Sequence, residues 1–190
     1  MEWILASASP RRKELFAKLI EKFDIIPATG EEKADTALSP ARLVCALAKA
    51  KAEEIASLSV AKGKYILGAD TIVAYGNEIL GKPKDKADAF RMLKLLSGNT
   101  HHVYTGVCIL GEKQGKRVEL CACEKSEVVF ECLSDETIQT YIDGGSPMDK
   151  AGAYGIQDGF LVKEIQGSYS NIVGLPLELC EKLLQQLQSL

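Results

Sequence analysis

The segment Tyr65–Tyr75, with the sequence YILGADTIVAY, is the most strongly apolar part of the chain. An apolar run closed by the turn-forming pair Gly76–Asn77 predicts a central β-strand, and Glu78–Leu80 predicts its hairpin return. Asp70 lies in the middle of this strand. Burying a carboxylate is costly unless it meets a metal ion or hydrogen-bond donors, so Asp70 is a candidate functional residue. Its neighbour Thr71 is expected to face the opposite side of the strand.

A second constraint comes from Ser7–Arg12, SASPRR, which follows the short apolar run Trp3–Ala6. A serine followed by a proline predicts a helix start at Pro10. Arg11 and Arg12 then stand at the positive end of the helix dipole, which costs about 0.3 to 1 kcal/mol each unless an anion offsets it. A phosphate site at this helix start is one interpretation. An ordinary capped helix with solvated arginines is the other, and these residues alone do not decide between them.

Two lysines are placed where they can reach a site. In the helix predicted from Pro40, apolar residues recur every four positions at Leu43, Leu47 and Ile55, and Lys51 shares that face. Lys51 therefore either snorkels at the edge of the core or reaches into a site, whereas Lys49 is expected to be solvated. Lys82 precedes Pro83, which favours an extended backbone and projection from a loop.

The remaining pattern mixes helices and strands without strict alternation. It predicts an α/β domain over residues 1–190, with three layers, two lobes and a mixed, partly antiparallel sheet. Residues 146–157 mix glycines with charged and amide side chains, which is typical of a loop lining a site. The other expected elements are helices at 10–20, 85–96, 134–143 and 175–187, strands at 23–26, 101–110, 117–132 and 160–165, and a turn at 167–171.

Composition narrows the class of protein. A formal net charge of -3 and a pI of about 5.5 disfavour a nucleic-acid partner. The sequence shows neither a membrane span nor a signal peptide, so we expect a cytoplasmic protein without a membrane partner. The six cysteines are scattered and the two histidines are adjacent, which predicts reduced thiols rather than a zinc site.

Seven motifs occur in order along the chain, namely Ser7–Arg12, Gly68–Thr71, Gly81–Pro83, Leu96–Gly98 with His101, Thr105–Val107, Asp149–Gln157 and Gly174–Leu177. Together they resemble one family, the Maf-type nucleoside triphosphate pyrophosphatases, also described as septum formation proteins. The resemblance runs from Ile4 to the last helix and implies a two-lobed fold like that of inosine-triphosphate pyrophosphatases. It further implies hydrolysis of a nucleoside triphosphate to the monophosphate and pyrophosphate, a divalent cation such as Mg²⁺ or Mn²⁺, a homodimer and a link to cell division.

The resemblance also implies roles for individual residues. It identifies phosphate-binding and catalytic positions at Ser7, Arg12, Glu32, Lys51, Asp70 and Lys82. A triphosphate needs several cations around it and a carboxylate for the metal or the attacking water. Asp70 is therefore expected to act as general base or metal ligand, with Glu32 assisting at the metal, and Glu31 is an alternative to Glu32.

Three positions separate the branches of this family. The branch acting on 7-methyl-GTP carries tryptophan at Arg11, glutamine at Thr71 and glutamate at Gln157, so this chain resembles the dTTP/UTP branch. An amide both donates and accepts, which suits the O/NH edge of uracil or thymine. We therefore expect dTTP and UTP as substrates. The competing hypothesis is a nucleotide-binding regulator of septum formation without significant turnover, in which Asp70 would be dispensable.

Overall fold

The computed structural model describes residues 1–30 and 37–190. Its described strands form one mixed sheet in the order β2-β1-β3-β5-β6-β7, with β4 paired to β3. The strand β1 is parallel to β2 and β3, and the other pairs are antiparallel. The strands are β1 (Trp3–Leu5), β2 (Asp24–Ile25), β3 (Tyr65–Tyr75), β4 (Glu78–Leu80), β5 (Thr100–Lys113), β6 (Lys116–Phe130) and β7 (Val162–Gln166).

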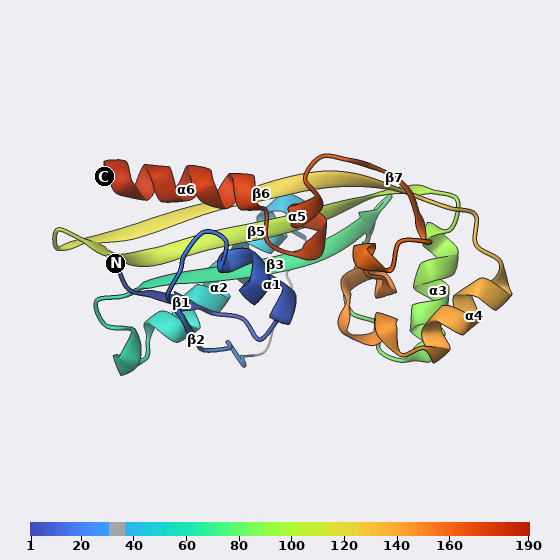
Figure 1. The fold of residues 1–190 in the computed structure, drawn as a ribbon, viewed down its shortest axis with the longest axis horizontal. Helices are drawn as coiled ribbons and strands as arrows, with labels where there is room; N and C mark the ends of the chain where they lie inside the picture. The colour runs from blue at the N-terminus through green and yellow to red at the C-terminus, as the bar shows by residue number, and fades with distance from the viewer. Residues whose placement is uncertain (31–36) are drawn as a thin grey trace.

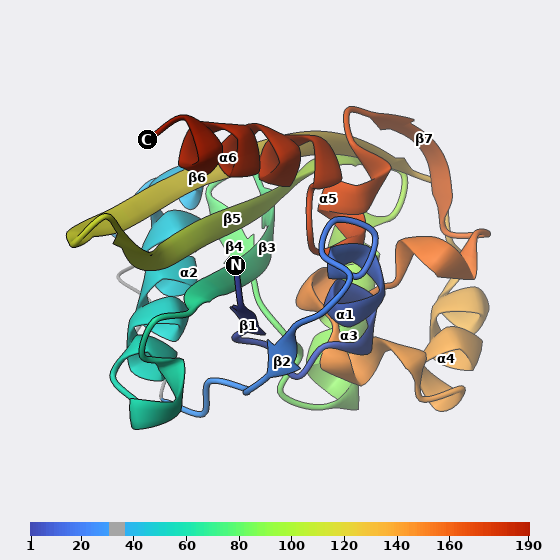
Figure 2. The same ribbon diagram turned by 60° about the vertical axis from the view of Figure 1, so that its left-hand side comes forward.

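Helices lie on both faces of this sheet, which makes the three expected layers (Figures 1 and 2). The helix α2 covers one face of β3, β5 and β6, while α1, α5 and α6 lie on the other. The helices are α1 (Pro10–Phe16), α2 (Pro40–Ala56), α3 (Lys86–Leu96), α4 (Asp135–Asp143), α5 (Tyr169–Val173) and α6 (Leu177–Ser189), with 3₁₀ turns η1 (Ser59–Ala61), η2 (Ser146–Asp149), η3 (Ala151–Ala153) and η4 (Ile156–Asp158).

The strand β3 has a continuous apolar sequence because helices cover both faces of the sheet at this strand. Ile66 packs with Ala48 and Ile55 of α2, whereas the next residue, Leu67, packs with Leu183 on the opposite side. Successive strand residues point to opposite faces, so each needs an apolar partner when both faces are covered. The α/β class with a mixed sheet is confirmed.

A second lobe forms at the far end of the long strands, where α3 and α4 lie side by side (Figure 1). Its core joins Val73 and Val103 from the sheet with Leu93 of α3 and Ile138 of α4. The 3₁₀ turns η2 and η3 pack against α3. The two-lobed organisation is therefore present, and β3 and β5 contribute residues to both lobes.

Most predicted elements are confirmed, with two corrections in the backbone. The helix α1 ends at Phe16 instead of reaching Ile20, because the chain continues in turns with hydrogen bonds such as Leu19 N to Phe16 O. Residues expected to form a turn after Gly167 instead begin α5. Ser168 caps this short helix by accepting a hydrogen bond from Asn171 N.

The cysteine prediction is corrected as well. Cys108 and Cys121 form a disulfide between β5 and β6, where they stand directly opposite each other. Opposed residues in an antiparallel pair project their side chains to the same face, and the sequence spacing of 13 residues did not reveal that register. The expected free thiols are present at Cys45, Cys123, Cys132 and Cys180. None of the described helices has the length and apolar content that a membrane crossing requires.

Candidate active site

A cavity of about 830 Å³ is lined by residues of both lobes. It gathers every predicted site residue that the structure describes, while Glu32 and its alternative Glu31 lie outside the described residues. Five of the described lining side chains are cationic and two are carboxylates, so the cavity suits a polyanion. The predicted residues that line it are Ser7, Arg11, Arg12, Lys51, Asp70, Thr71, Lys82 and Gln157.

Lys51 and Asp70 form an ion pair at the centre of this set. The Lys51 Nζ donates to Asp70 Oδ1 at 2.5 Å, and the two side chains are 17% and 8% exposed. Lys51 therefore reaches into the cavity from α2 and does not snorkel to the surface. Lys49, two residues earlier, pairs with Glu119 on the exposed side, as expected for a solvated charge.

Two glycines bring α2 close enough for this contact. A Cβ atom on Gly68 of β3 would lie 2.2 Å from Ala48 O, and one on Gly106 of β5 would lie 2.3 Å from Val44 O. Both distances are far below van der Waals contact, so only glycine allows the helix backbone to rest on these strands. The glycines set the depth of α2 and with it the reach of Lys51.

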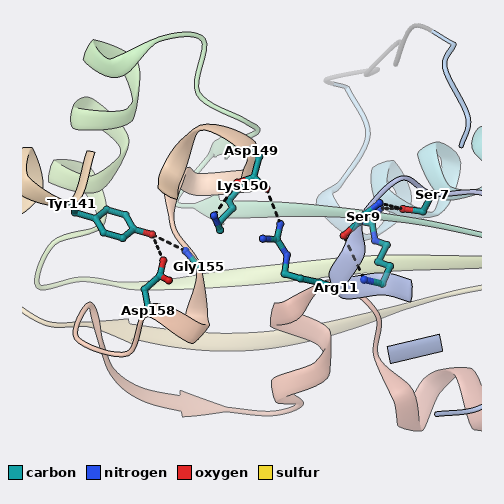
Figure 3. Close-up of polar contacts among 9 residues, drawn as sticks. Ser7, Ser9, Arg11, Tyr141, Asp149, Lys150, Gly155 and Asp158 are labelled. Carbon is teal, nitrogen blue, oxygen red and sulfur yellow. Dashed lines mark hydrogen bonds and ion pairs between the residues drawn. The ribbon is translucent and has the colours of Figure 1, made fainter. Parts of the chain in front are cut away.

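The serines at the start of α1 contact the backbone of their own loop. Ser9 accepts a hydrogen bond from Arg12 N at 3.4 Å and Ser7 Oγ accepts one from Ser9 N at 3.2 Å, so the predicted capped helix start is present. Figure 3 shows Ser7 and Ser9 beside Arg11. Ser7 is only 7% exposed and lines the cavity, where its Oγ also accepts a hydrogen bond from Arg12 Nη1 at 3.5 Å.

The two arginines of this loop extend to different parts of the cavity. Arg12 donates through Nε to Gly174 O at 2.9 Å and through Nη2 to Thr71 Oγ1 at 3.0 Å. Arg11 instead pairs with Asp149 Oδ2 at 3.6 Å, on the second lobe (Figure 3). Arg12 is thus held by β3 and by the residue that ends α5, whereas Arg11 contacts the irregular 149–158 segment.

Asp70 and Thr71 occupy opposite sides of β3, as predicted, yet both line the cavity. The hydroxyls of Thr71 and Thr105 lie 2.9 Å apart, and Thr105 donates to Asn171 O at 2.9 Å. This chain of hydrogen bonds connects Arg12 through Thr71 to α5. The guanidinium is therefore oriented before any ligand enters.

The opposite side of the cavity is built from loops and 3₁₀ turns. Lys82 follows β4, and the loop is fastened by a hydrogen bond from Gly152 N to Gly81 O at 3.0 Å. Gln157 is exposed on η4 and lines the cavity from the second lobe.

The structure adds Lys150 and Tyr154 to the cavity, which the sequence placed only within a loop lining a site. Lys150 is 14% exposed and pairs with Asp149 at 2.8 Å. The sequence signal that could have identified Lys150 as a site residue is a lysine next to a run of glycines and alanines. Tyr154 bonds His101 Nε2 at 2.8 Å, and burial lowers the pKa of His101 to about 3 while raising the pKa of Tyr154. Both side chains are neutral at pH 7, so they support the cavity by packing.

Comparison with known protein families shows which family this chain belongs to. The family model described as Maf-like protein matches residues 2–187. The chain belongs to the Maf family. Its relatives include proteins named dTTP/UTP pyrophosphatase from Agathobacter rectalis, 48% identical over 98% of this chain and 96% of that protein, and from Bacillus cytotoxicus, 44% identical over 99% and 96%. A relative of the same name from Thermococcus gammatolerans is 46% identical over 95% and 94%.

Solved structures agree with this family at the level of the fold. The Ham1 protein of Coxiella burnetii matches with a TM-score of 0.54 and 16% identity, covering 98% of this chain and 99% of that one. The Ham1 protein of Staphylococcus aureus matches with a TM-score of 0.52 and 14% identity over the same shares. The two-lobed Maf chain thus shares its architecture with Ham1 proteins despite low sequence identity.

Proposed function

We propose that this Maf protein hydrolyses nucleoside triphosphates, with dTTP and UTP preferred, to the monophosphate and pyrophosphate. The observation that carries the proposal is the Lys51–Asp70 pair inside a cavity lined mainly by cations. The names of its relatives support the same substrates. A carboxylate beside phosphates repels them, so a protein that only bound nucleotide would use Asp70 only to hold a metal ion, whereas hydrolysis also needs a base for the attacking water. Asp70 therefore favours the enzyme over the regulator.

The reaction follows from the chemistry of these side chains. Arg12, Lys51 and Lys82 neutralise the phosphates, and the Ser7 hydroxyl adds a hydrogen bond. Asp70 accepts a proton from a water molecule, whose oxygen then bonds to the α-phosphorus. The bond from that phosphorus to the bridging oxygen breaks, and pyrophosphate leaves with the bonding electrons. The same cations stabilise the charge that develops on the leaving group.

The site also suits the divalent cation that the family implies. Asp70 offers a hard carboxylate donor in the cavity, and Mg²⁺ is typically held by one or two carboxylates together with substrate phosphates. The described residues contain no cluster of three or more histidine, cysteine or acidic side chains, so a further carboxylate is expected from Glu32 or Glu31. A bound Mg²⁺ or Mn²⁺ would neutralise phosphate charge.

Base selection is proposed for Arg11, Thr71 and Gln157. The exposed amide of Gln157 can donate to and accept from a pyrimidine edge, whereas a glutamate would only accept. Arg11 lies on the same side of the cavity through its contact with Asp149. Thr71 lines the cavity, and its hydroxyl accepts a hydrogen bond from Arg12 at 3.0 Å, so it connects base selection with a phosphate-binding residue.

Pyrophosphate release from dTTP, UTP, CTP and 7-methyl-GTP with Mg²⁺ or Mn²⁺ tests this proposal. We expect dTTP and UTP to be turned over fastest, and a preference for 7-methyl-GTP would overturn the branch assignment. The Asp70→Asn variant should lose turnover by about 10²- to 10⁴-fold while still binding a non-hydrolysable dTTP analogue. Retained turnover in this variant would instead support a role other than general base or metal ligand for Asp70.

The setting of this activity follows from the family and the charge. We propose that the protein acts in the cytoplasm on free nucleotides. Its acidic pI of about 5.5 disfavours binding to nucleic acid. The family also suggests a homodimer. Light scattering of the purified protein measures the oligomeric state, and titration with single-stranded DNA at moderate salt should show no binding.

A further inference from the structure

A tyrosine outside the cavity holds the turn that carries Gln157. The hydroxyl of Tyr141, on α4, donates to Asp158 Oδ2 at 2.5 Å and accepts from Gly155 N at 3.1 Å (Figure 3). These two partners lie at opposite ends of η4, the single turn formed by Ile156–Asp158. One hydroxyl thus bridges the residue before η4 and the residue at its end.

The position of the turn depends on contacts outside it, because α5 packs against it and the Tyr141 hydroxyl bonds residues at both of its ends. A single 3₁₀ turn has few internal hydrogen bonds and is marginal by itself. Gln157 is exposed, so its own packing does not orient it, whereas Ile156 beside it is only 8% exposed. Tyr141 is 7% exposed and its ring meets Phe160 edge to face at 5.7 Å between centroids. The buried neighbours therefore determine where the Gln157 side chain starts.

The same contacts continue to the second base-selecting residue. A Cβ atom on Gly155 would lie 2.9 Å from Asp158 Oδ2 and 2.9 Å from Lys150 Cε, so the Gly155 backbone is wedged between these side chains. Lys150 pairs with Asp149 at 2.8 Å, and Asp149 pairs with Arg11 at 3.6 Å. A shift of the Gly155 backbone would therefore also move Lys150 and Asp149, and Asp149 is the ion-pair partner of Arg11.

The position of the Gln157 amide matters because an amide can both donate and accept a hydrogen bond, so its chemistry alone does not select one base. Uracil and thymine present a carbonyl oxygen beside an N–H, whereas cytosine presents an amino group beside a ring nitrogen that accepts. A glutamine can serve either pattern by turning its amide over. Discrimination therefore depends on holding the amide at one distance and angle from the base, which the backbone of η4 sets.

We propose that Tyr141 is a positioning residue for base selection, acting through Gly155 and Asp158 on Gln157. This inference rests on the proposed function of the same site. Tyr141 is not among the described residues that line the cavity, so we expect it to act on the substrate only through other residues. Loss of its hydroxyl should weaken nucleotide binding and pyrimidine discrimination and leave the chemistry at Asp70 intact.

The Tyr141→Phe variant tests this directly, because it keeps the ring in the core. Losing the hydroxyl should raise the KM for dTTP about three- to tenfold, lower the preference for dTTP over dCTP by a similar factor and leave kcat within about twofold. The matched control is Tyr65→Phe, which removes the hydrogen bond from Tyr65 to Glu112 O in the other lobe. The control should leave KM and preference unchanged.

A second variant and a double-mutant cycle exclude a merely structural effect. Asp158→Ala removes the other end of the bridge and should reproduce the KM change. In a Gln157→Ala background, Tyr141→Phe should change the preference by less than it does in the wild type, because both changes act mainly on the same contact. Two results would overturn the inference. One is that the effects of Gln157→Ala and Tyr141→Phe on the preference are additive, and the other is that Tyr141→Phe lowers kcat and the melting temperature without changing the preference.

Failure of the proposed function would look different. If the wild-type protein does not hydrolyse dTTP, affinities for a non-hydrolysable dTTP analogue and its dCTP counterpart replace the kinetic constants. Weaker and less selective binding by Tyr141→Phe would then support the positioning role while the enzyme proposal falls. Equal binding by wild type and Tyr141→Phe would overturn the positioning role in either case.

Discussion

The two sides of the cavity are built in different ways. On the first lobe, Lys51 and Asp70 project from the long elements α2 and β3, and each is held within hydrogen-bond distance of a partner. On the second lobe, residues 149–158 form short 3₁₀ turns with an exposed Gln157. Regular elements hold side chains with less positional freedom than turns do. We propose that Lys51 and Asp70 on the first side take part in the chemistry and that Gln157 on the second side contributes to base selection.

Among the variants that compare the two sides of the cavity, the largest effect should come from removing the cation that pairs with Asp70. Lys51→Met keeps the length and the buried stem of the side chain but removes its charge, so kcat for dTTP should fall by about 10²-fold or more. The matched control is Lys49→Met on the same helix, where the lost contact is an exposed ion pair with Glu119. Steady-state kinetics measure both variants. Similar kcat values for the two would contradict a division of labour between the lobes.

The depth of α2 can be changed without touching a charged group. Gly106→Val would place side-chain atoms against Val44 O, which lies 2.3 Å from the Cβ position, and should lower the free energy of unfolding by about 1 to 3 kcal/mol. Because the helix is displaced, kcat should fall as well. Urea unfolding and kinetics provide the two measurements. The control is Gly144→Ala, whose backbone φ of -66° accepts any residue.

Stability of the second lobe should depend on pH through His101. Burial lowers its pKa to about 3, below the value of about 6.5 expected when unfolded. The unfolded chain therefore binds more protons below pH 6.5, and the free energy of unfolding falls by up to roughly 1.4 kcal/mol per pH unit as pH falls from 6.5 toward 3. His101→Gln should flatten this dependence in chemical unfolding between pH 7 and pH 4. An unchanged slope would contradict the buried neutral histidine.

The smallest effect should come from the base-selecting side chain. Gln157→Ala should raise the KM for dTTP about three- to tenfold and leave kcat within about twofold, because one hydrogen bond to the base is lost. Initial rates with dTTP and dCTP measure the change, and Gln166→Ala, on the exposed edge strand β7, is the control. A large loss of kcat would show that the two sides of the cavity do not act separately.

Local signals predicted most of the fold. The apolar run at Tyr65–Tyr75 coincides with β3, and Asp85 and Ser134 cap α3 and α4 as their sequence contexts indicated. The turn expected at 167–171 was wrong because Gly167 marks only the entry to α5. Glycine signals a change of direction, and the helix that follows depends on the Ser168 cap and on packing against β5 and β6.

The candidate site was predictable where chemistry is unusual for its local context. A carboxylate in an apolar strand and a lysine on a leucine face single out Asp70 and Lys51, because each violates the expected burial pattern. Tyr141 gave no such signal, since a tyrosine on the apolar face of a helix is ordinary core. Its partners Gly155 and Asp158 lie 14 and 17 residues away, and only folding brings the three together.

The sequence by itself determined the strands and helices, the resemblance to the Maf family and the identity of the charged groups. These follow from local periodicity, turn residues and motif order, which each act over a few residues. The tertiary structure decided that Lys51 reaches Asp70, that Arg11 and Arg12 diverge, and that Tyr141 supports η4. Those outcomes depend on the depth at which α2 rests on two glycines and on how the lobes close around one cavity, and distances between remote segments are set only by packing.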